Sequence, residues 1–382
     1  MFALLTAALV ATLVVAAPAA CQSPSWAGSN LYFLHALPAA EQSRYIDTLA
    51  SWGVKVVRLW VTGLSGGCIK GSTNVTALPH LESTTIGAYD TTVLAALDAT
   101  LSRLHRAGLK AVISPHDAGQ IGGANGCDVY CAAYGNQSTF YASAAARAAY
   151  DARLAAILDY RSPSFGGRRW AQLDEVVLAF DVQNEPMIDA LELLEQDDPD
   201  DWLCGRARVL KGLIGDGSRV KVATGGIGGS QYCCDHEFNA LDKALRCEAI
   251  DIVNVHGYMS KAADWAYFIT GDASIPDAVD AAGTGKKVMI EEWGVAADSQ
   301  DGFEAQVAVF NDAGVPWASV LAPGLLYWQV VPGKDQTQDG APASCGYDGF
   351  EIGLNSSKGD VAAAVAKANS ATAAQDWTGY VY

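Results

Sequence analysis

The chain has 382 residues, of which 50% are hydrophobic and 18% are charged, and its formal net charge is −17. This charge excludes nucleic acid as a partner, because polyanions are repelled and no basic cluster offers a phosphate-binding face. No Pro-, Ser- or Thr-rich linker divides the chain, so the composition predicts one globular domain without an appended binding module.

The first nineteen residues are apolar and end in Ala17-Pro18-Ala19, which is typical of a signal peptide cleaved before Ala20. A membrane anchor is the alternative, since no Lys or Arg precedes the apolar core. That core is short for a span, however, and no stop-transfer pattern follows it. We therefore expect a signal peptide over 1–19, a secreted catalytic domain over 20–382, and no membrane association after cleavage.

Eight short runs rich in β-branched and aromatic residues follow, separated by helical patterns. We predict strands over residues 29–34, 54–60, 109–114, 176–185, 220–226, 250–258, 286–292 and 324–330. Several are nearly continuous in hydrophobicity, which is typical of parallel strands buried on both faces. The alternation predicts an α/β protein with a single (β/α)8 TIM barrel. An open doubly wound sheet is the alternative, but no glycine-rich turn follows the first strand.

Helical periods lie between these strands. Pro38 and Gly53 bound the first helix, and Gly108 ends the second, in which leucines recur at helical spacing. The expected helices cover residues 38–53, 89–108, 139–161, 197–214, 301–314 and about 359–375.

Nine cysteines in a secreted chain predict disulfide-stabilised loops, and the odd number leaves one unpaired. Cys127 and Cys131 are close enough to close a small loop. The sequence does not fix the other pairings, and metal binding by the "CCDHE" stretch at 233–237 is an alternative for two of the cysteines. Sequons at Asn74, Asn136 and Asn355 are consistent with a secreted glycoprotein.

Polar and aromatic side chains stand at or near the carboxyl ends of the predicted strands, where a barrel of this type builds its active site. In chain order they are Arg58 with Trp60, His116, Asn184 with Glu185, His256 with Tyr258, Glu291 with Glu292, and Trp328. Buried strands rarely tolerate such groups, so their repetition on separate strands indicates a site. Taken singly, Arg58 or His116 could be a structural partner, and Trp60 or Trp328 could belong to the core.

Two of these strand ends carry carboxylates and lie far apart in the sequence. Hydrolysis of a glycosidic bond by a retaining enzyme needs a protonated carboxylic acid and an ionised carboxylate about 5–5.5 Å apart. Like charges at that distance also hold one proton on the pair, because each raises the pKa of the other. We therefore expect Glu185 to be the acid and its partner to lie at the end of the seventh strand.

The motifs "VRLW", "SPHDAG", "FDVQNEP", "VNVHGYM", "IEEWG" and "LLYWQ", in this order, resemble glycoside hydrolase family 5 over essentially the whole mature chain. The resemblance implies that Glu185 is the general acid/base and that Glu292, rather than Glu291, is the nucleophile. Strand alternation agrees in part, because it sends the two glutamates to opposite faces, so that at most one points straight into the barrel mouth.

The same resemblance implies roles for the other residues at the strand ends. Asn184 would bond the 2-hydroxyl of the reacting sugar, and Arg58 would orient and ionise the nucleophile. His256 and Tyr258 would line that subsite, with Tyr258 near the nucleophile. His116 would bind sugar hydroxyls, and Trp328 would stack on the ring. No metal or organic cofactor is implied.

Within the family, the segments from Gly28 to Trp60 and from Tyr89 to Ile113 look most like the fungal endo-β-1,4-mannanase branch. The loop after Trp60 and the glucanase-like "SPHDAG" depart from that branch. We therefore expect a monomer that hydrolyses β-1,4-mannan, with β-1,4-glucan as the second substrate. Transglycosylation by the same site, or a secreted sugar-binding protein on an inactive barrel, are the alternatives.

Overall fold

The computed structural model describes residues 23–71, 74–229, 232–233, 236–295, 299–318, 329–334, 339–340, 343, 345–347, 351–354 and 360–382. The predicted signal peptide at 1–19 lies outside these residues and stays a prediction. Among the helices of the described residues, none has both the length and the apolarity needed to cross a bilayer.

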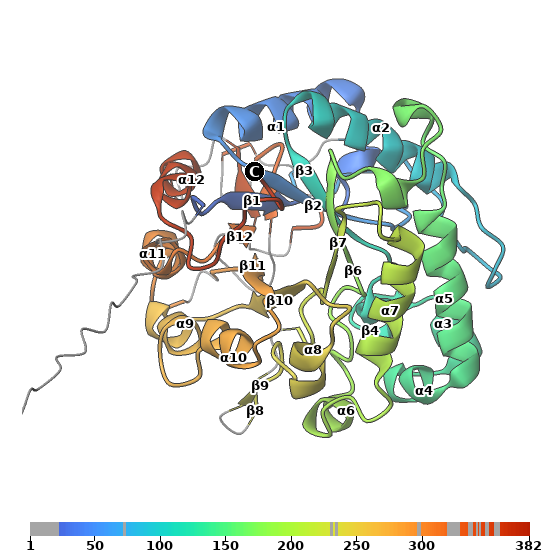
Figure 1. Cartoon of the computed structure of the whole chain (residues 1–382). Coiled ribbons are helices and arrows are strands. Elements are labelled where there is room, and N and C mark those ends of the chain that lie inside the picture. The colour runs from blue at the N-terminus through green and yellow to red at the C-terminus, as the bar shows by residue number, and fades with distance from the viewer. Residues whose placement is uncertain are drawn as a thin grey trace, which may run out of the picture.

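Eight parallel strands close into a barrel, which confirms the predicted fold (Figure 1). The barrel strands are β1 (Ala27–Asn30), β2 (Val56–Trp60), β3 (Lys110–Ser114), β6 (Val177–Asp181), β7 (Lys221–Ala223), β10 (Ile252–Gly257), β11 (Lys287–Trp293) and β12 (Trp317–Ala318). They follow one another around the barrel in the order β1-β12-β11-β10-β7-β6-β3-β2.

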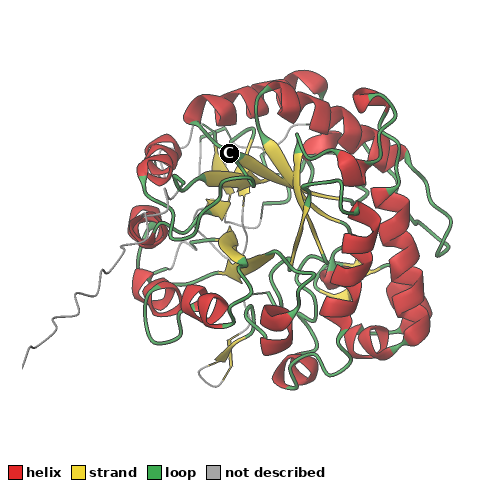
Figure 2. Cartoon of the chain, viewed as in Figure 1, coloured by secondary structure: helices red, strands yellow, loops and turns green. Residues whose placement is uncertain are grey.

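Helices surround the strands on the outside of the barrel (Figure 2). They are α1 (Ala39–Trp52), α2 (Thr92–Arg106), α3 (Val129–Tyr134), α4 (Gln137–Ala142), α5 (Ala144–Leu158), α6 (Leu191–Glu195), α7 (Trp202–Ile214), α8 (Asp242–Arg246), α9 (Ala262–Ile269), α10 (Ile275–Ala281), α11 (Phe303–Ala313) and α12 (Val361–Ser370). Short 3-10 helices cover Leu34–Ala36, Ala118–Gln120, Pro163–Phe165 and Trp170–Gln172.

Small two-stranded sheets lie in the loops: β4 (Ile121–Gly123) with β5 (Gly126–Cys127), β8 (Tyr232–Cys233) with β9 (His236–Glu237), and β13 (Gln329–Val331) with β14 (Glu351–Gly353).

The predicted position of the eighth barrel strand, 324–330, is wrong. Trp317 pairs with Ile290 of β11 and with Ala27 of β1, so the strand that closes the barrel is β12. Residues 324–328 lie outside the described part of the chain, and β13, which follows them, pairs with β14 in a separate sheet. A strand of two residues carries no periodic signal, which is why its sequence did not reveal it.

The predicted ends of the first helix are confirmed. Pro38 is the N-cap residue of α1, and Gly53 ends the helix in the left-handed conformation with φ 90°. The helix expected over 139–161 is instead two helices, α4 and α5. Ser143 separates them, because its hydroxyl accepts a hydrogen bond from the Ala146 amide and so caps α5.

Three disulfides tie loops together within the described residues: Cys68–Cys345, Cys127–Cys131 and Cys204–Cys247. The small loop predicted for Cys127 and Cys131 is therefore confirmed. Cys21 and Cys234 lie outside the described part of the chain, as does the side chain of Cys233, so the metal alternative for "CCDHE" stays untested.

The inner face of the barrel changes from apolar to polar along the strands. Its apolar layer consists of Val56, Val112, Leu178, Ala179, Ala223, Ile252, Met289 and Ala318, with Trp26, Ala373 and Trp377 packed against it. Side chains two residues apart share one face of a strand, so the next inward positions form a second layer. We call the residues of this second layer the polar layer: Arg58, Ser114, Asp181, Asn254 and Glu291.

His35, in the short 3-10 helix after β1, gives the fold a dependence on pH. Its ring is buried, and its Nε2 lies 3.1 Å from the carbonyl oxygen of Thr62. Burial lowers the pKa of His35 to about 4, although the bond to Thr62 opposes this shift. The unfolded chain therefore takes up a proton near pH 6.5 that the folded chain does not accept until about pH 4.

We predict that acidification between these two pH values removes up to about 3 kcal/mol of stability through His35. Replacement by glutamine keeps a donor for the Thr62 carbonyl and removes the titrating group. In urea unfolding at a series of pH values, His35→Gln should therefore gain stability relative to the parent as the pH falls through this range. A difference between the two proteins that stays constant with pH would contradict the prediction.

Candidate active site

Glu185 and Glu292 lie together where the barrel strands end. Glu185 follows β6, and Glu292 belongs to β11. One carboxylate oxygen of each lies within 4.8 Å of the other and of a ring nitrogen of His256. The fold thus brings two carboxyl groups that are distant in sequence to the spacing used for displacement at a sugar carbon, about 5–5.5 Å between the groups.

The backbone around Glu185 holds its side chain in the site. Glu185 has φ 47°, in the left-handed region that non-glycine residues seldom adopt. Its amide donates to the carbonyl of Gly225 at 2.8 Å, and the amide of Met187 donates to the Tyr141 hydroxyl at 2.8 Å. Such a conformation persists only where its surroundings impose it, and it is common at functional sites. The turn after β6 is therefore built for the placement of Glu185.

Glu292 is surrounded by donors. The Nη1 of Arg58 donates to one of its oxygens, and the Tyr258 hydroxyl donates to the other at 2.8 Å. The pKa of Glu292 is raised overall, because burial and the charge of Glu185 outweigh the lowering by His256, Arg58 and Tyr258. These donors favour the ionised form of a carboxylate that is only 1% exposed.

Arg58 lies fully buried in the polar layer and connects several strands. Besides Glu292, its guanidinium donates to Asp181 at 3.1 Å, to Ser114 at 2.9 Å and to Asn184 at 2.8 Å. Burial alone would lower the pKa of Arg58, but the carboxylates of Glu291, Asp181 and Glu292 raise it, so the group stays charged.

Asn184 has a fixed amide orientation. Its Oδ1 accepts from Arg58, and its Nδ2 donates to the buried carboxylate of Asp117 at 2.9 Å. Asp117 also accepts from the Asn125 side chain at 2.8 Å and from the Gly119 amide at 3.0 Å. Burial raises the pKa of Asp117, although Asn184 and Asn125 oppose this. Only one of the two N–H groups of the Asn184 amide is directed at Asp117.

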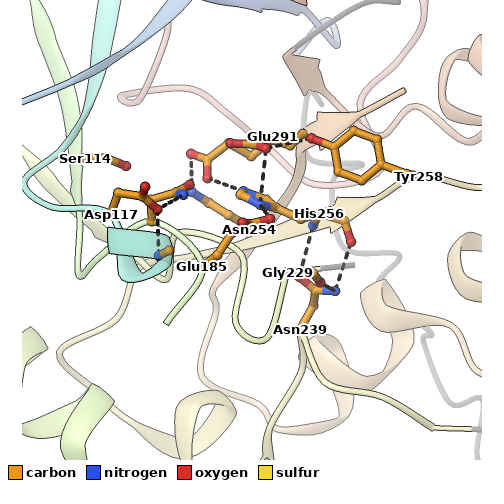
Figure 3. Close-up of polar contacts among 12 residues, drawn as sticks. Ser114, Asp117, Glu185, Gly229, Asn239, Asn254, His256, Tyr258 and Glu291 are labelled. Carbon is orange, nitrogen blue, oxygen red and sulfur yellow. Dashed lines mark hydrogen bonds and ion pairs between the residues drawn. The ribbon is translucent and has the colours of Figure 1, made fainter. Parts of the chain in front are cut away.

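The ring of His256 lies between Glu291 and Glu185, as Figure 3 shows, and Glu292 is a third carboxylate near its Nδ1. Its Nε2 is 3.0 Å from Glu291, and its Nδ1 is 3.1 Å from Glu185 and 3.7 Å from Glu292. The side chain of Asn239 bonds both the amide and the carbonyl of His256. Burial alone would lower the pKa of His256, but Glu292, Glu185 and Glu291 raise it to about 10. His256 is therefore an imidazolium near neutral pH.

His116 contacts protein groups through both ring nitrogens. Nε2 lies 2.7 Å from the carboxylate of Asp128, and Nδ1 lies 2.9 Å from the side-chain amide of Gln183. The ring is 4% exposed and packs edge-on against Tyr130 and Tyr150. These contacts fix the ring beside the site, and its binding of sugar hydroxyls stays a prediction.

The expectation from strand alternation, that at most one of Glu291 and Glu292 points straight into the barrel mouth while Glu291 supports the site from behind, stays a prediction. Both side chains contact Arg58. The register of β10 against β11 shifts between Val255 and His256, so that Val255 pairs with Ile290 whereas His256 pairs with Glu292. Alternation alone places Glu291 inward, two residues after Met289, and this irregularity brings Glu292 into the site as well.

Some polar residues of the site did not emerge from the sequence analysis. Ser114, Asp117, Asp181 and Asn254 link the predicted residues, and all are buried. Asn254 donates to both Asp181 and Glu291. A signal for Asp181 and Asn254 existed, since each interrupts an apolar strand at an inward position. Burial first, and then the charge of Glu291, raise the pKa of Asp181 to about 7.

A cleft of about 590 Å³ adjoins this site. Trp60, which lies beneath Arg58, and Asp117 both line it, as do Tyr32, Lys70, Gln120 and Asn125. The rings of Tyr32 and Trp60 lie 5.5 Å apart at 32° to one another. Trp60 is thus a wall of the cleft as well as a core residue. Trp328 lies outside the described residues, so its predicted stacking role is not observed.

Glu185, His256 and Glu292 are also the described residues whose ligand atoms are close enough to share a metal ion. A metal-ligating histidine must be neutral. The pKa of His256 is raised to about 10 by the same carboxylates that would be its co-ligands. The arrangement therefore favours a proton on His256 over a metal ion between the three groups.

Comparisons with known proteins show the family of this chain and structures of similar fold. The model of the family described as Cellulase (glycosyl hydrolase family 5) matches residues 18–321. An endo-1,4-β-mannanase from Rhizomucor miehei has a similar fold, with a TM-score of 0.65 and 16% identity over 91% of this chain and 94% of that one. An endo-1,4-β-D-mannanase from Thermotoga petrophila RKU-1 is similar as well, with a TM-score of 0.60 and 19% identity over 90% of this chain and 98% of that one. No curated protein sequence matches. Since the family model spans most of its length, the chain belongs to glycosyl hydrolase family 5.

Proposed function

We propose that the protein is a secreted, retaining, endo-acting glycoside hydrolase with Glu185 as general acid/base and Glu292 as nucleophile. The observation that carries the proposal is the approach of their carboxylate oxygens to within 4.8 Å across one site. In an inverting enzyme the two groups stand farther apart, at about 6.5–9.5 Å, to leave room for water.

In the first step the carboxylate of Glu292 attacks the anomeric carbon, and the bond from that carbon to the leaving oxygen breaks. Glu185 gives its proton to that oxygen, so the leaving sugar departs as an alcohol. Arg58 and Tyr258 hold the two oxygens of Glu292, which orients the nucleophile. The product of this step is a covalent glycosyl-enzyme ester on Glu292.

In the second step Glu185, now ionised, takes a proton from water as the water attacks the anomeric carbon. The ester bond to Glu292 breaks, and the sugar is released with its original anomeric configuration. A sugar hydroxyl that replaces water at this point gives transglycosylation. Asn184 supports both steps, since the second N–H of its amide, which has no partner among the described residues, is suited to bond the 2-hydroxyl as the oxocarbenium ion develops.

The substrate that we propose is β-1,4-mannan, cleaved within the chain. The solved structures with a similar fold include proteins named as mannanases, and a cleft lined by Trp60 and Asp117 lies beside the site. β-1,4-Glucan is the second candidate, because "SPHDAG" resembles the glucanases. Mannose and glucose differ by one axial hydroxyl, so assay on purified polysaccharides decides between them. Secretion is supported by three disulfides in the described residues.

We predict that Glu185→Gln and Glu292→Gln each lower polysaccharide hydrolysis by about 10³-fold or more, because each removes one participant in bond cleavage. Glu291→Gln should keep a measurable rate. Release of reducing ends from mannan and glucan measures all three, with thermal unfolding of each variant as the control for folding. Equal rates in Glu292→Gln and the parent would contradict the assigned nucleophile. Oligosaccharide binding by the parent without any reducing-end release would favour the sugar-binding alternative.

A second prediction concerns metal ions. Because His256 is protonated near neutral pH, hydrolysis should be unchanged within about twofold after dialysis against EDTA, and added Mg²⁺, Ca²⁺ or Zn²⁺ should not raise the rate of the dialysed protein. A loss of activity that one of these ions restores would show that the three-residue group binds a catalytic metal.

A further inference from the structure

Glu291 is buried beneath the catalytic pair and directly precedes the proposed nucleophile. It is 0% exposed, and its carboxylate contacts Arg58 at 3.2 Å and His256 at 3.0 Å and accepts from Asn254. Burial alone would raise the pKa of Glu291, but Arg58 and His256 lower it, so the group is ionised. A buried carboxylate that takes no part in bond cleavage is costly unless its partners need its charge.

The partner that distinguishes Glu291 is His256. Because Nε2 of His256 is directed at Glu291, the ring orientation is fixed and Nδ1 faces Glu185. Nδ1–H donates to Oε1 of Glu185, which leaves Oε2 to carry the proton for the leaving oxygen. After that proton is transferred, the imidazolium lies beside the new carboxylate and stabilises it. Glu292, Glu185 and Glu291 all favour the charged ring, and Glu291 is the one of these three that takes no part in bond cleavage.

We propose that Glu291 is a positioning residue for the general acid: acting through His256, it anchors one oxygen of Glu185 so that the other delivers its proton to the leaving group. This inference rests on the proposed role of Glu185. Among the described residues, the charged groups that contact His256 include Glu185, Glu291 and Glu292.

The alternative is that Glu291 acts on the nucleophile Glu292 through Arg58, which contacts both. Replacement of Asp181 distinguishes these two roles of Glu291 and is a matched control. Like Glu291 it is a fully buried carboxylate of the polar layer that contacts both Arg58 and Asn254. It also accepts from Ser114, and none of its contacts is to His256. Asp181→Asn therefore perturbs the layer and Arg58 alone, whereas Glu291→Gln also removes the charge that faces His256.

The test uses two aryl glycosides of the sugar that the parent cleaves, one with a 2,4-dinitrophenyl and one with a phenyl leaving group. The dinitrophenolate departs without a proton, whereas the phenolate needs one. The ratio of kcat/KM for the two substrates reports general-acid assistance and does not depend on the fraction of folded protein. Glu185→Gln is the reference variant, since it should lower kcat/KM for the phenyl substrate far more than kcat/KM for the dinitrophenyl substrate.

We expect Glu291→Gln to lower kcat/KM for the phenyl substrate at least about tenfold more than for the dinitrophenyl substrate. Asp181→Asn should lower both by the same factor. An NMR titration of His256, assigned by comparison with His256→Gln, should give a pKa of about 10 in the parent, a lower pKa in Glu291→Gln and no change in Asp181→Asn.

Equal losses on the two substrates in Glu291→Gln, with Glu185→Gln still selective, would overturn the positioning role and leave the proposed function intact. A selective loss in Asp181→Asn as large as that in Glu291→Gln would overturn it as well, because the effect would then belong to the layer as a whole. If Glu185→Gln itself shows no selectivity, the assignment of Glu185 as the acid fails, and the positioning role fails with it.

Discussion

One buried guanidinium holds the site together. Arg58, on β2, reaches Ser114 of β3, Asp181 of β6 and Glu292 of β11, as well as Asn184 in the turn after β6. Removal of one partner from a buried ion pair leaves an uncompensated charge and costs about 3–5 kcal/mol. The same contacts that place the nucleophile therefore also join the carboxyl ends of four strands, β2, β3, β6 and β11.

The buried ionisable groups of the site differ in pKa according to which charged partners they contact. Glu291, between Arg58 and His256, has a lowered pKa, whereas Asp181, which meets Arg58 but not His256, has a pKa of about 7. His256 carries the second buried positive charge, because three glutamates outweigh the effect of its burial. The polar layer thus supports the catalytic pair with two fixed cations, while the side chain of Glu185 is 16% exposed.

The sequence predicted the parts of this arrangement that depend on local patterns. Glu185 and Glu292 stand at the ends of apolar strands, and a parallel barrel gathers those ends at one mouth. It could not predict that Glu291 and Glu292 both reach Arg58, because that depends on the register between β10 and β11. The two-residue β12 and the pairing of Cys68 with Cys345, 277 residues apart, are likewise properties of the folded chain and not of any short segment.

The central claim is that two carboxyl groups act on one sugar by way of a covalent intermediate. A glycoside with fluorine at carbon 2 and a good leaving group slows the second step more than the first, because the oxocarbenium-like transition state is destabilised and the leaving group still departs. Peptide mass spectrometry after such treatment should find the sugar attached to Glu292. Attachment to Glu291, or turnover with inversion of the anomeric configuration and no attached sugar, would contradict the account.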